Sequence, residues 1–289
     1  MDPAGAVAAF DDPRGDLREP HDPRARGRGS GPRGGGGQGG GRVSNVWQIC
    51  RRELKSYFVS PRGYLVLAAF LLLQGIVFYL IVQAFSREGA PVGSIMQIFL
   101  GRNIFFWIFV LLILPVITMG LIAEERRSGT VELLLTAPVT EAQVIGGKYL
   151  AAYLYYVSLW VPTLLYPLLL SSYAKLDPWP IAAGYLYLLC IGAPFVALGL
   201  WASSLSRSQI VAAMLTFALM FLFFIIPVFL EEQARAEWLR NGLVYINLWN
   251  PAGDFGKGIV DSRLIVYCLT STLFLLFLSA RSLEIRKAA

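Results

Sequence analysis

The stretch GLIAEERRSGTVELLLTAPVTEAQV, residues 120–144, connects two long apolar segments and predicts where each of them ends. The first segment runs into the charged residues 124–127, and Gly129 suits the left-handed position that often follows the last turn of a helix. Thr140 and Gln143 have the spacing of a capping box, which predicts the start of the next helix. The stretch therefore predicts two long helices joined by a structured connection.

A short apolar helix is predicted inside this connection, at residues 131–136. Thr130 is placed to cap it, and Glu132 lies in its first turn, where the helix dipole favours a negative charge. The helix has to end before Pro138, because the residue that precedes a proline disfavours helical angles. Its leucines at 133–135 make it apolar, and an apolar helix at a surface usually marks a contact with another molecule.

The composition identifies the chain as a membrane protein. Of its 289 residues, 56% are hydrophobic and 15% are charged, and the mean hydropathy is +0.57. Soluble domains are about 45–50% apolar and about 25% charged, whereas a membrane-crossing helix needs about 20 mostly apolar residues. Six segments meet this requirement: Tyr64–Phe85, Ile104–Ala123, Tyr149–Leu170, Ile181–Leu205, Ile210–Leu230 and Leu264–Ala280. The pattern excludes a cytosolic enzyme and predicts an all-α fold with six transmembrane helices.

Basic residues predict how these helices are oriented. Lys and Arg are more numerous before the first span, in the loops after the second and fourth spans, and after the last span than in the remaining loops. Loops rich in Lys and Arg stay on the cytoplasmic side, and six crossings place both termini on one side. Both termini are therefore expected in the cytoplasm.

A helix with one apolar and one basic face is predicted before the first span, over residues 46–58. A helix with this pattern and an aromatic residue on its apolar face lies in the plane of the membrane interface. Pro61 ends it. The residues assigned to this interfacial helix are Trp47, Arg51, Arg52, Leu54, Tyr57 and Phe58. The alternative is a plain basic flank that only sets the topology.

Residues 1–42 differ from the rest of the chain because they are rich in Gly, Pro and Arg. Such a segment buries too little apolar surface to offset the entropy of ordering, so it is predicted to be a disordered tail, followed by a membrane domain over residues 43–289. A second interpretation is an over-extended gene start, with translation beginning at Val43, since a valine codon can serve as a bacterial start. A mature N-terminus at Met1 would exclude this second interpretation.

Three segments resemble one family of membrane proteins. Residues 125–139, ERRSGTVELLLTAPV, are similar to the cytoplasmic signature of ABC-2-type transporter permeases. Residues 46–61, VWQICRRELKSYFVSP, resemble the opening of the gliding-motility-type branch of that family. Residues 250–263, NPAGDFGKGIVDSR, resemble the segment before the last span in the same branch. The three segments occur in the order that the family has, which makes them more specific together than any one of them alone.

The resemblance implies a permease subunit of an ATP-driven exporter, with a cytoplasmic coupling helix that receives the motion of a separate ATPase subunit. The positions that match this ATPase-coupling element are Glu124, Glu125, Arg126, Gly129, Thr130, Glu132, Leu133, Leu134 and Pro138. The interfacial helix is implied to touch the ATPase as well. A re-entrant segment is implied before the last helix, with Pro251, Phe255, Gly256, Gly258 and Asp261 as its assigned residues.

No cofactor or metal ion is expected in this chain. Gly146-Gly147-Lys148-Tyr149 is the nearest match to the phosphate-binding pattern GxxxxGK[ST], and it lacks both the spacing and the hydroxyl. The single histidine, His21, and three scattered cysteines provide no pattern of metal ligands. ATP is therefore expected to bind to a partner subunit.

The expected partners are a separate ABC ATPase subunit, a second permease copy or paralogue, membrane lipid and, where neighbouring genes encode one, an auxiliary extracytoplasmic protein. Nucleic acid is not an expected partner, and the expected location is the bacterial plasma (inner) membrane. A secondary transporter or channel is one alternative, although the six apolar segments contain none of the charged residues that mark ion paths. A structural scaffold of a motility or secretion machine is another. An intramembrane metalloprotease would need histidines in its spans, and these spans contain none.

Overall fold

A computed structural model of the chain describes residues 38–88, 92–101, 103–129, 140–234 and 236–287. Apart from Gln38, the described residues belong to one unit, Gly39–Ala289. Most of the predicted tail and the whole of the predicted coupling helix at 131–136 lie outside the described residues. The first helix begins at Gln38, earlier than the domain start predicted at Val43.

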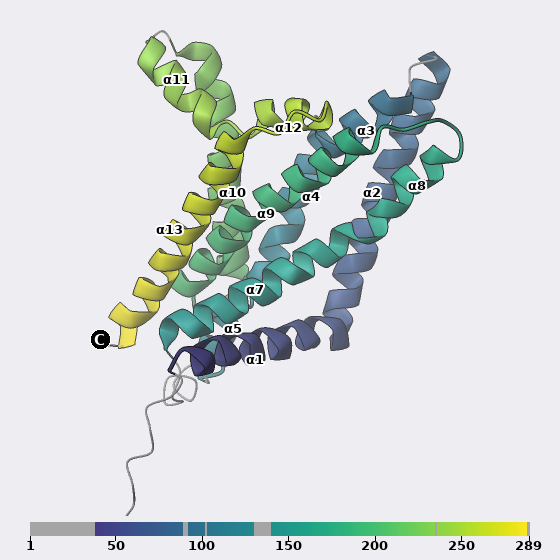
Figure 1. The fold of residues 1–289 in the computed structure, drawn as a ribbon. Coiled ribbons are helices and arrows are strands. Elements are labelled where there is room, and N and C mark those ends of the chain that lie inside the picture. The colour runs from purple at the N-terminus through teal and green to yellow at the C-terminus, as the bar shows by residue number, and fades with distance from the viewer. Residues whose placement is uncertain (1–37, 89–91, 102, 130–139, 235, 288–289) are drawn as a thin grey trace, which may run out of the picture. The chain divides into compact units, whose positions relative to one another are not determined.

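Helices account for almost all of the part of the chain that the structure describes (Figure 1). In chain order they are α1 (Gln38–Val59), α2 (Pro61–Glu88), α3 (Val92–Leu100), α4 (Ile104–Thr118), α5 (Ala123–Arg127), α7 (Glu141–Trp160), η1 (Pro162–Leu164), α8 (Leu165–Ser171), α9 (Pro178–Leu205), α10 (Gln209–Gln233), α11 (Glu237–Ile246), α12 (Trp249–Gly256) and α13 (Ser262–Lys287).

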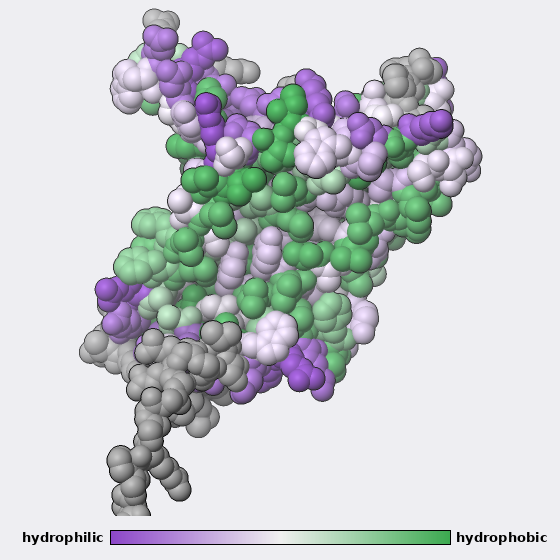
Figure 2. All heavy atoms as spheres, viewed as in Figure 1, coloured by the Kyte–Doolittle hydropathy of each residue, from purple (hydrophilic) through white to green (hydrophobic). Residues whose placement is uncertain are grey.

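Six of the helical segments are long and apolar enough to cross a membrane, which confirms the predicted fold class. They are Pro61–Arg87, Gly93–Arg127, Glu141–Ser171, Pro178–Leu205, Gln209–Glu231 and Ser262–Glu284. Figure 2 shows hydrophobic residues over the middle of the visible face and hydrophilic residues toward both ends. This is the surface expected of a helix bundle that is surrounded by lipid.

Two of the predicted spans are not continuous helices. The span predicted at Ile104–Ala123 is interrupted by a turn at residues 119–122, between α4 and α5. The span predicted at Tyr149–Leu170 changes to a 3₁₀ turn at Pro162, because a proline inside a helix removes a backbone donor. The hydroxyl of Thr163 there donates to the carbonyl of Trp160 at 2.7 Å.

The central helix of the bundle is α9, which packs against α3, α4, α7, α10, α12 and α13. Glycines let it approach its neighbours closely. A Cβ at Gly192 would lie 2.0 Å from the ring of Tyr156, and one at Gly199 would lie 2.2 Å from the hydroxyl of Thr118. Small residues at helix crossings are typical of membrane bundles, which have no hydrophobic driving force between their helices.

The two ends of this unit carry different short helices (Figure 1). At one end lie α1 and α5, and at the other lie α3, α11 and α12. Of these, α3 was not predicted from the sequence. The segment predicted to be re-entrant forms α11 and α12, which have 10 and 8 residues and are too short to cross a bilayer. Its entry into the outer leaflet stays a prediction.

Candidate functional site

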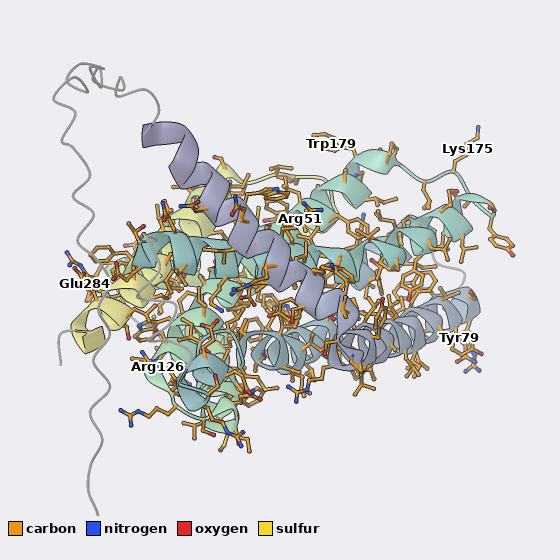
Figure 3. The ribbon with its side chains drawn as sticks, turned by 90° about the horizontal axis from the view of Figure 1, so that it is seen from below. Arg51, Tyr79, Arg126, Lys175, Trp179 and Glu284 are labelled. Carbon is orange, nitrogen blue, oxygen red and sulfur yellow. The ribbon has the colours of Figure 1, made fainter. Side chains whose placement is uncertain are left out.

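Helix α1 lies across the first turns of α7, and Figure 3 shows it running over the other helices with Arg51 on it. The contact is made possible by Gly147, where an added Cβ would lie 2.7 Å from Cγ2 of Ile49 and 3.0 Å from the carbonyl oxygen of Val46. A larger residue at this position would push α1 away from α7.

The next residue, Lys148, joins three helices through its ammonium group. Its side chain is 2% exposed, and its Nζ lies 2.7 Å from Oε1 of Glu125 in α5 and 3.3 Å from Oε1 of Glu53 in α1. We call Glu53, Glu125 and Lys148 the charge cluster. A buried ammonium is tolerated only when it is paired and hydrogen-bonded, so docking of α1 and α5 satisfies a group that α7 has buried.

The charge cluster also sets the protonation state of Glu53. Burial alone would raise the pKa of this carboxyl, but Lys148 and Arg52 hold its pKa below its ordinary value of 4.5. Nη2 of Arg52, at the exposed edge of the cluster, lies 2.9 Å from Oε1 of Glu53. Glu53 is therefore a carboxylate at neutral pH and keeps its attraction for Lys148.

Tyr57, one turn further along α1, ties this helix to α4 and α7. Its ring stacks on that of Tyr155 with centroids 4.6 Å apart and planes 11° apart. Its hydroxyl donates to the carbonyl oxygen of Ile117 at 2.8 Å, near the end of α4 where carbonyls lack helical donors. Burial raises the pKa of the Tyr57 phenol, so the hydroxyl stays protonated and remains a donor. Tyr155 in turn donates to the carbonyl of Gly63 in α2 at 2.6 Å.

We call the turn at residues 119–122, between α4 and α5, the elbow. A hydroxyl from α9 holds it in place. Oγ of Ser203 accepts from the backbone N–H groups of Ile122 and Ala123, both at 3.1 Å, and donates to the carbonyl oxygen of Met119 at 3.0 Å. Ser203 thus caps α5 from a different helix, and the elbow connects α9 to the charge cluster.

The residues predicted for ATPase coupling are only partly within the described ranges. Glu124 is exposed, Glu125 belongs to the charge cluster, and Arg126 is half-buried. Gly129 has φ +72°, which confirms the left-handed position predicted for it. The other five residues assigned to this element, Thr130, Glu132, Leu133, Leu134 and Pro138, lie outside the described residues.

The next helix begins as predicted. Thr140 caps α7, and both hydrogen bonds of the capping box with Gln143 are present. The two ends of the 120–144 connection are therefore formed as the sequence predicts, with α5 and Gly129 on one side and Thr140 on the other.

Residues 47–241, more than half of the chain, match the sequence profile of the family described as ABC-2 family transporter protein. The chain belongs to the ABC-2 transporter family. The match includes α1, the elbow, the charge cluster and the connection to α7. A comparison with curated proteins gives no match. The chain is therefore a multi-pass membrane component of an ABC transporter, in a family whose membrane subunits are not themselves ATPases.

In this ABC-2 subunit, the residues predicted for the interfacial helix divide between two surroundings. Arg51 and Arg52 are exposed, as expected for the basic face. Trp47 and Phe58 are also exposed, at 53% and 38%, and can reach a membrane. Leu54 and Tyr57 are half-buried and pack on the core of the bundle. The apolar face predicted to contact lipid is thus used partly to dock α1 on the protein.

The residues predicted for the re-entrant segment lie at the opposite end of the ABC-2 subunit, away from the charge cluster (Figure 1). Pro251 is within α12, and the buried ring of Phe255 lies 5.5 Å from that of Tyr187. Gly258 has φ +84°. The two remaining residues take part in local packing and capping: Gly256 approaches the backbone of Gln97, and Asp261 accepts from the N–H of Arg263 at 2.9 Å.

Sequence reasoning did not find most of the residues that hold the α1 end together. Glu53 gave a signal that could have been used, because it is a carboxylate three residues from Cys50 on the apolar face of α1. The pair Gly146-Gly147 before Lys148 was a second signal, since adjacent glycines mark a close helix crossing. Ser203 and Tyr155 gave no signal that distinguishes them from other polar residues in spans.

Within the ranges that the structure describes, no three His, Cys, Asp or Glu side chains are grouped closely enough to hold a metal ion.

Proposed function

We propose that this chain is the permease subunit of an ABC exporter of the gliding-motility-type branch, and that it couples ATP hydrolysis by a separate ATPase subunit to export. In this proposal α1, α5 and the start of α7 move together as one unit. The cytoplasm lies on the α1 side, where the ATPase docks. The substrate is moved toward the α11 and α12 side of a bacterial plasma membrane.

The observation that carries the proposal is the charge cluster. Lys148 bonds to Glu53 of α1 and to Glu125 of α5, and both helices belong to segments that resemble the ATPase-contacting parts of the family. A displacement of α1 or α5 is transmitted to α7 through Lys148 and to α9 through Ser203 at the elbow. Packed helices linked in this way move as rigid bodies, which is what a transmission element requires.

The position of Lys148 also weighs against a secondary transporter or channel. Ionisable residues on an ion path lie within the span and face a cavity or the bundle interior. Lys148 lies two turns after the start of α7 at Glu141, close to one end of the span, and both of its partners come from helices at that end. It stabilises the junction between helices and does not mark a path through the bundle.

A second permease copy or paralogue is part of the proposal. One face of α4 exposes an apolar residue at every fourth position, and α10, which packs against α4, exposes an apolar face as well. The exposed residues are Ile104, Ile108, Leu112 and Val116 on α4, and Ile210, Met214, Phe217 and Phe221 on α10. Adjacent apolar faces of this length fit a partner helix pair as well as lipid.

Purification of the tagged full-length chain from its native membranes in mild detergent tests the proposal. We expect a polypeptide with a Walker motif to copurify, to be labelled by a photoreactive ATP analogue, and to hydrolyse ATP faster in the complex than alone. The double variant Glu125→Ala/Gly129→Val should keep the partner bound and lower its ATPase rate by about tenfold, because it removes a contact of Lys148 and the left-handed turn after α5.

The matched control is Lys257→Ala, which alters an exposed charge at the opposite end of the subunit. It should leave the ATPase rate unchanged. Absence of any ATP-labelled partner would contradict the proposed function, and an unchanged ATPase rate in the double variant would contradict the role of α5.

A further inference from the structure

A cavity of about 210 Å³ lies where α1 meets α2, beside the elbow. We call it the elbow cavity. Its lining comes from α1, α2, α4, α5, α7 and α10 and from the turns between them. Its lining includes two charged side chains, Arg62 and Glu124, and an apolar set formed by Val66, Val116, Ile117, Leu121 and Tyr155.

The polar part of the elbow cavity presents both signs of charge. Arg62 and Glu124 are exposed residues that line it, and neither forms an ion pair with another residue in the described part of the chain. Glu53 also lines the cavity, but its carboxylate is already bonded to Lys148 and Arg52. The cavity therefore offers one guanidinium and one carboxylate to a ligand.

Ser56, Ser60 and Gln209 add neutral polar groups to the lining, and most of the remaining wall is apolar. Val66, Val116, Ile117 and Leu121 line it together with the ring of Tyr155. Val116 is 41% exposed, and Leu65 beside Val66 is 71% exposed, so the apolar wall continues onto the outer surface of α2 and α4. A ligand that fits this wall has an apolar part that extends from the cavity along the outside of the bundle.

The location of the elbow cavity agrees with the depth of lipid headgroups. Helix α1 carries exposed basic residues and an exposed Trp47, whereas α2 begins a membrane span at Pro61. A junction between an amphipathic helix and a spanning helix lies at the boundary between headgroups and acyl chains. Sites for drug-sized ligands usually measure about 300–1,000 Å³, so a cavity of about 210 Å³ is sized for a headgroup and not for a whole amphiphile.

From these features we propose that the elbow cavity binds the headgroup of a zwitterionic phospholipid with a primary amine, of the phosphatidylethanolamine type. Arg62 binds the phosphate, and Glu124 accepts hydrogen bonds from the ammonium group. The acyl chains leave past Val116 and Leu65. The site requires only that the chain lies in a membrane. A failure of this lipid proposal would therefore leave the proposed ATPase coupling and export unaffected, and a failure of those would leave the lipid site unaffected.

Native mass spectrometry of the delipidated full-length chain in detergent tests this proposal. It is titrated with phosphatidylethanolamine and, separately, with phosphatidylglycerol, which has the phosphate but lacks the amine. We expect Arg62→Gln to lower the affinity for both lipids about tenfold or more, because each lipid loses a charge-assisted bond to its phosphate. We expect Glu124→Gln to lower the affinity for phosphatidylethanolamine by a similar factor. The affinity for phosphatidylglycerol should stay equal or rise, because the variant removes a negative charge that repels this anionic lipid.

Arg281→Gln and Glu284→Gln are the matched controls. These residues form an exposed pair in α13 that lines no part of the elbow cavity, and neither variant should change the affinity for either lipid. Equal effects of Glu124→Gln on both lipids, or effects of Arg62→Gln no larger than those of Arg281→Gln, would overturn the proposal. Water-soluble glycerophosphoethanolamine that binds as tightly as the lipid would overturn the assignment to a membrane lipid.

A crosslinking measurement on the unmodified chain tests the site even if the variants fail to fold. Phosphatidylethanolamine with a photoreactive group on its first acyl carbons should crosslink within residues 62–66 or 116–121, and excess unlabelled lipid should prevent this. Crosslinks confined to other helices would contradict the site.

Discussion

The two ends of the subunit are held together by different kinds of bond. At the α1 end, a buried ammonium, two carboxylates and three hydroxyls connect six helices. At the opposite end, no ion pair occurs among the described residues. Tyr187 donates to the carbonyl of Leu248 at 2.5 Å, Trp179 donates to that of Gly258 at 2.8 Å, and the Glu231 carboxylate accepts from the neutral side-chain amides of Asn247 and Asn250. Close packing of the backbones also holds the opposite end together, since a Cβ at Gly101 would lie 2.3 Å from the carbonyl oxygen of Ala252.

The difference shows where each end gets its stability. Neutral hydrogen bonds and close packing fix one arrangement and respond little to charge or pH. An ion pair with a buried partner is costly to break on one side only, so its helices tend to stay docked together and move together. We therefore expect perturbations of charge to act mainly at the α1 end, where the ion pairs lie, and perturbations of volume to act at both ends.

The largest effect is expected from Lys148→Met, which removes the centre of the charge cluster. It leaves two carboxylates close together without their shared cation, and we expect the free energy of unfolding in detergent to fall by about 3–5 kcal/mol. Lys257→Met, at the exposed end of α12, should change it by less than about 0.5 kcal/mol. Denaturant titration followed by tryptophan fluorescence measures both.

A double variant separates lost charge pairing from lost packing at Lys148. If Lys148→Met acts by leaving carboxylates unpaired, Lys148→Met/Glu125→Gln should recover part of the stability. A double variant that is less stable than Lys148→Met would contradict the role assigned to the charge cluster.

The second prediction compares close packing at the two ends. Gly147→Ala and Gly101→Ala should each lower the free energy of unfolding by about 1–3 kcal/mol, because their Cβ atoms would meet atoms at 2.7 Å and 2.3 Å. Only Gly147→Ala should also expose the buried thiol of Cys50, one residue after Ile49. Maleimide labelling measures this in a background where Cys190 and Cys268 are Ser.

Gly93→Ala is the control for close packing, since a Cβ there meets nothing within 4 Å. Equal labelling of Cys50 in the Gly147→Ala and Gly101→Ala variants would show that α1 docking does not depend locally on the glycine at 147.

The third prediction concerns single hydroxyls at the two ends. Tyr57→Phe and Tyr187→Phe each remove one hydrogen bond to a carbonyl and keep the ring. Each should therefore lower the free energy of unfolding by about 1 kcal/mol. Tyr57→Phe should raise Cys50 labelling about fivefold, since 1 kcal/mol of docking energy is about that factor. Tyr187→Phe should leave it unchanged, and a rise in both variants would break the comparison between the ends.

Local spacing in the sequence was enough to predict the helices and several of their ends. The six spans follow from hydropathy, Gly129 from the rule for helix ends, and the Thr140–Gln143 capping box from its three-residue spacing. Each of these depends on residues that are close in the chain, for which the physics is local. The turn at residues 119–122 could not be predicted because the apolar run continues through it.

The candidate site depends on contacts between distant parts of the chain. Lys148 and Glu53 are 95 positions apart, and Ser203 lies 81 positions from Ile122. Hydropathy gives α1 an apolar face but does not tell whether lipid or protein covers it. The structure places Tyr57 of that face on the protein and leaves Trp47 exposed. Such choices depend on the packing of the whole bundle, which a single sequence does not specify.

The smallest effect, and the most specific for charge, is the response to acid. The pKa of the Glu53 carboxyl is lower in the folded chain than its ordinary value of 4.5, so the unfolded chain binds its proton first as the pH falls. The stabilisation from Glu53 is therefore complete above about pH 5 and is lost as the pH falls through the folded value. Thermal unfolding from pH 7 to pH 3 should show wild type losing more stability than Glu53→Gln, with a constant difference above about pH 5.

Comparing wild type with Glu53→Gln isolates this carboxyl, because every other acidic residue is present in both proteins. Tyr187→Phe has all its acidic groups intact, so its stability should run parallel to that of wild type over the same range. Parallel curves for Glu53→Gln would mean that the charge cluster does not stabilise α1 docking. Non-parallel curves for Tyr187→Phe would mean that the Tyr187 hydrogen bond also depends on acid, and the contrast between an end held by ion pairs and an end without them would then be wrong.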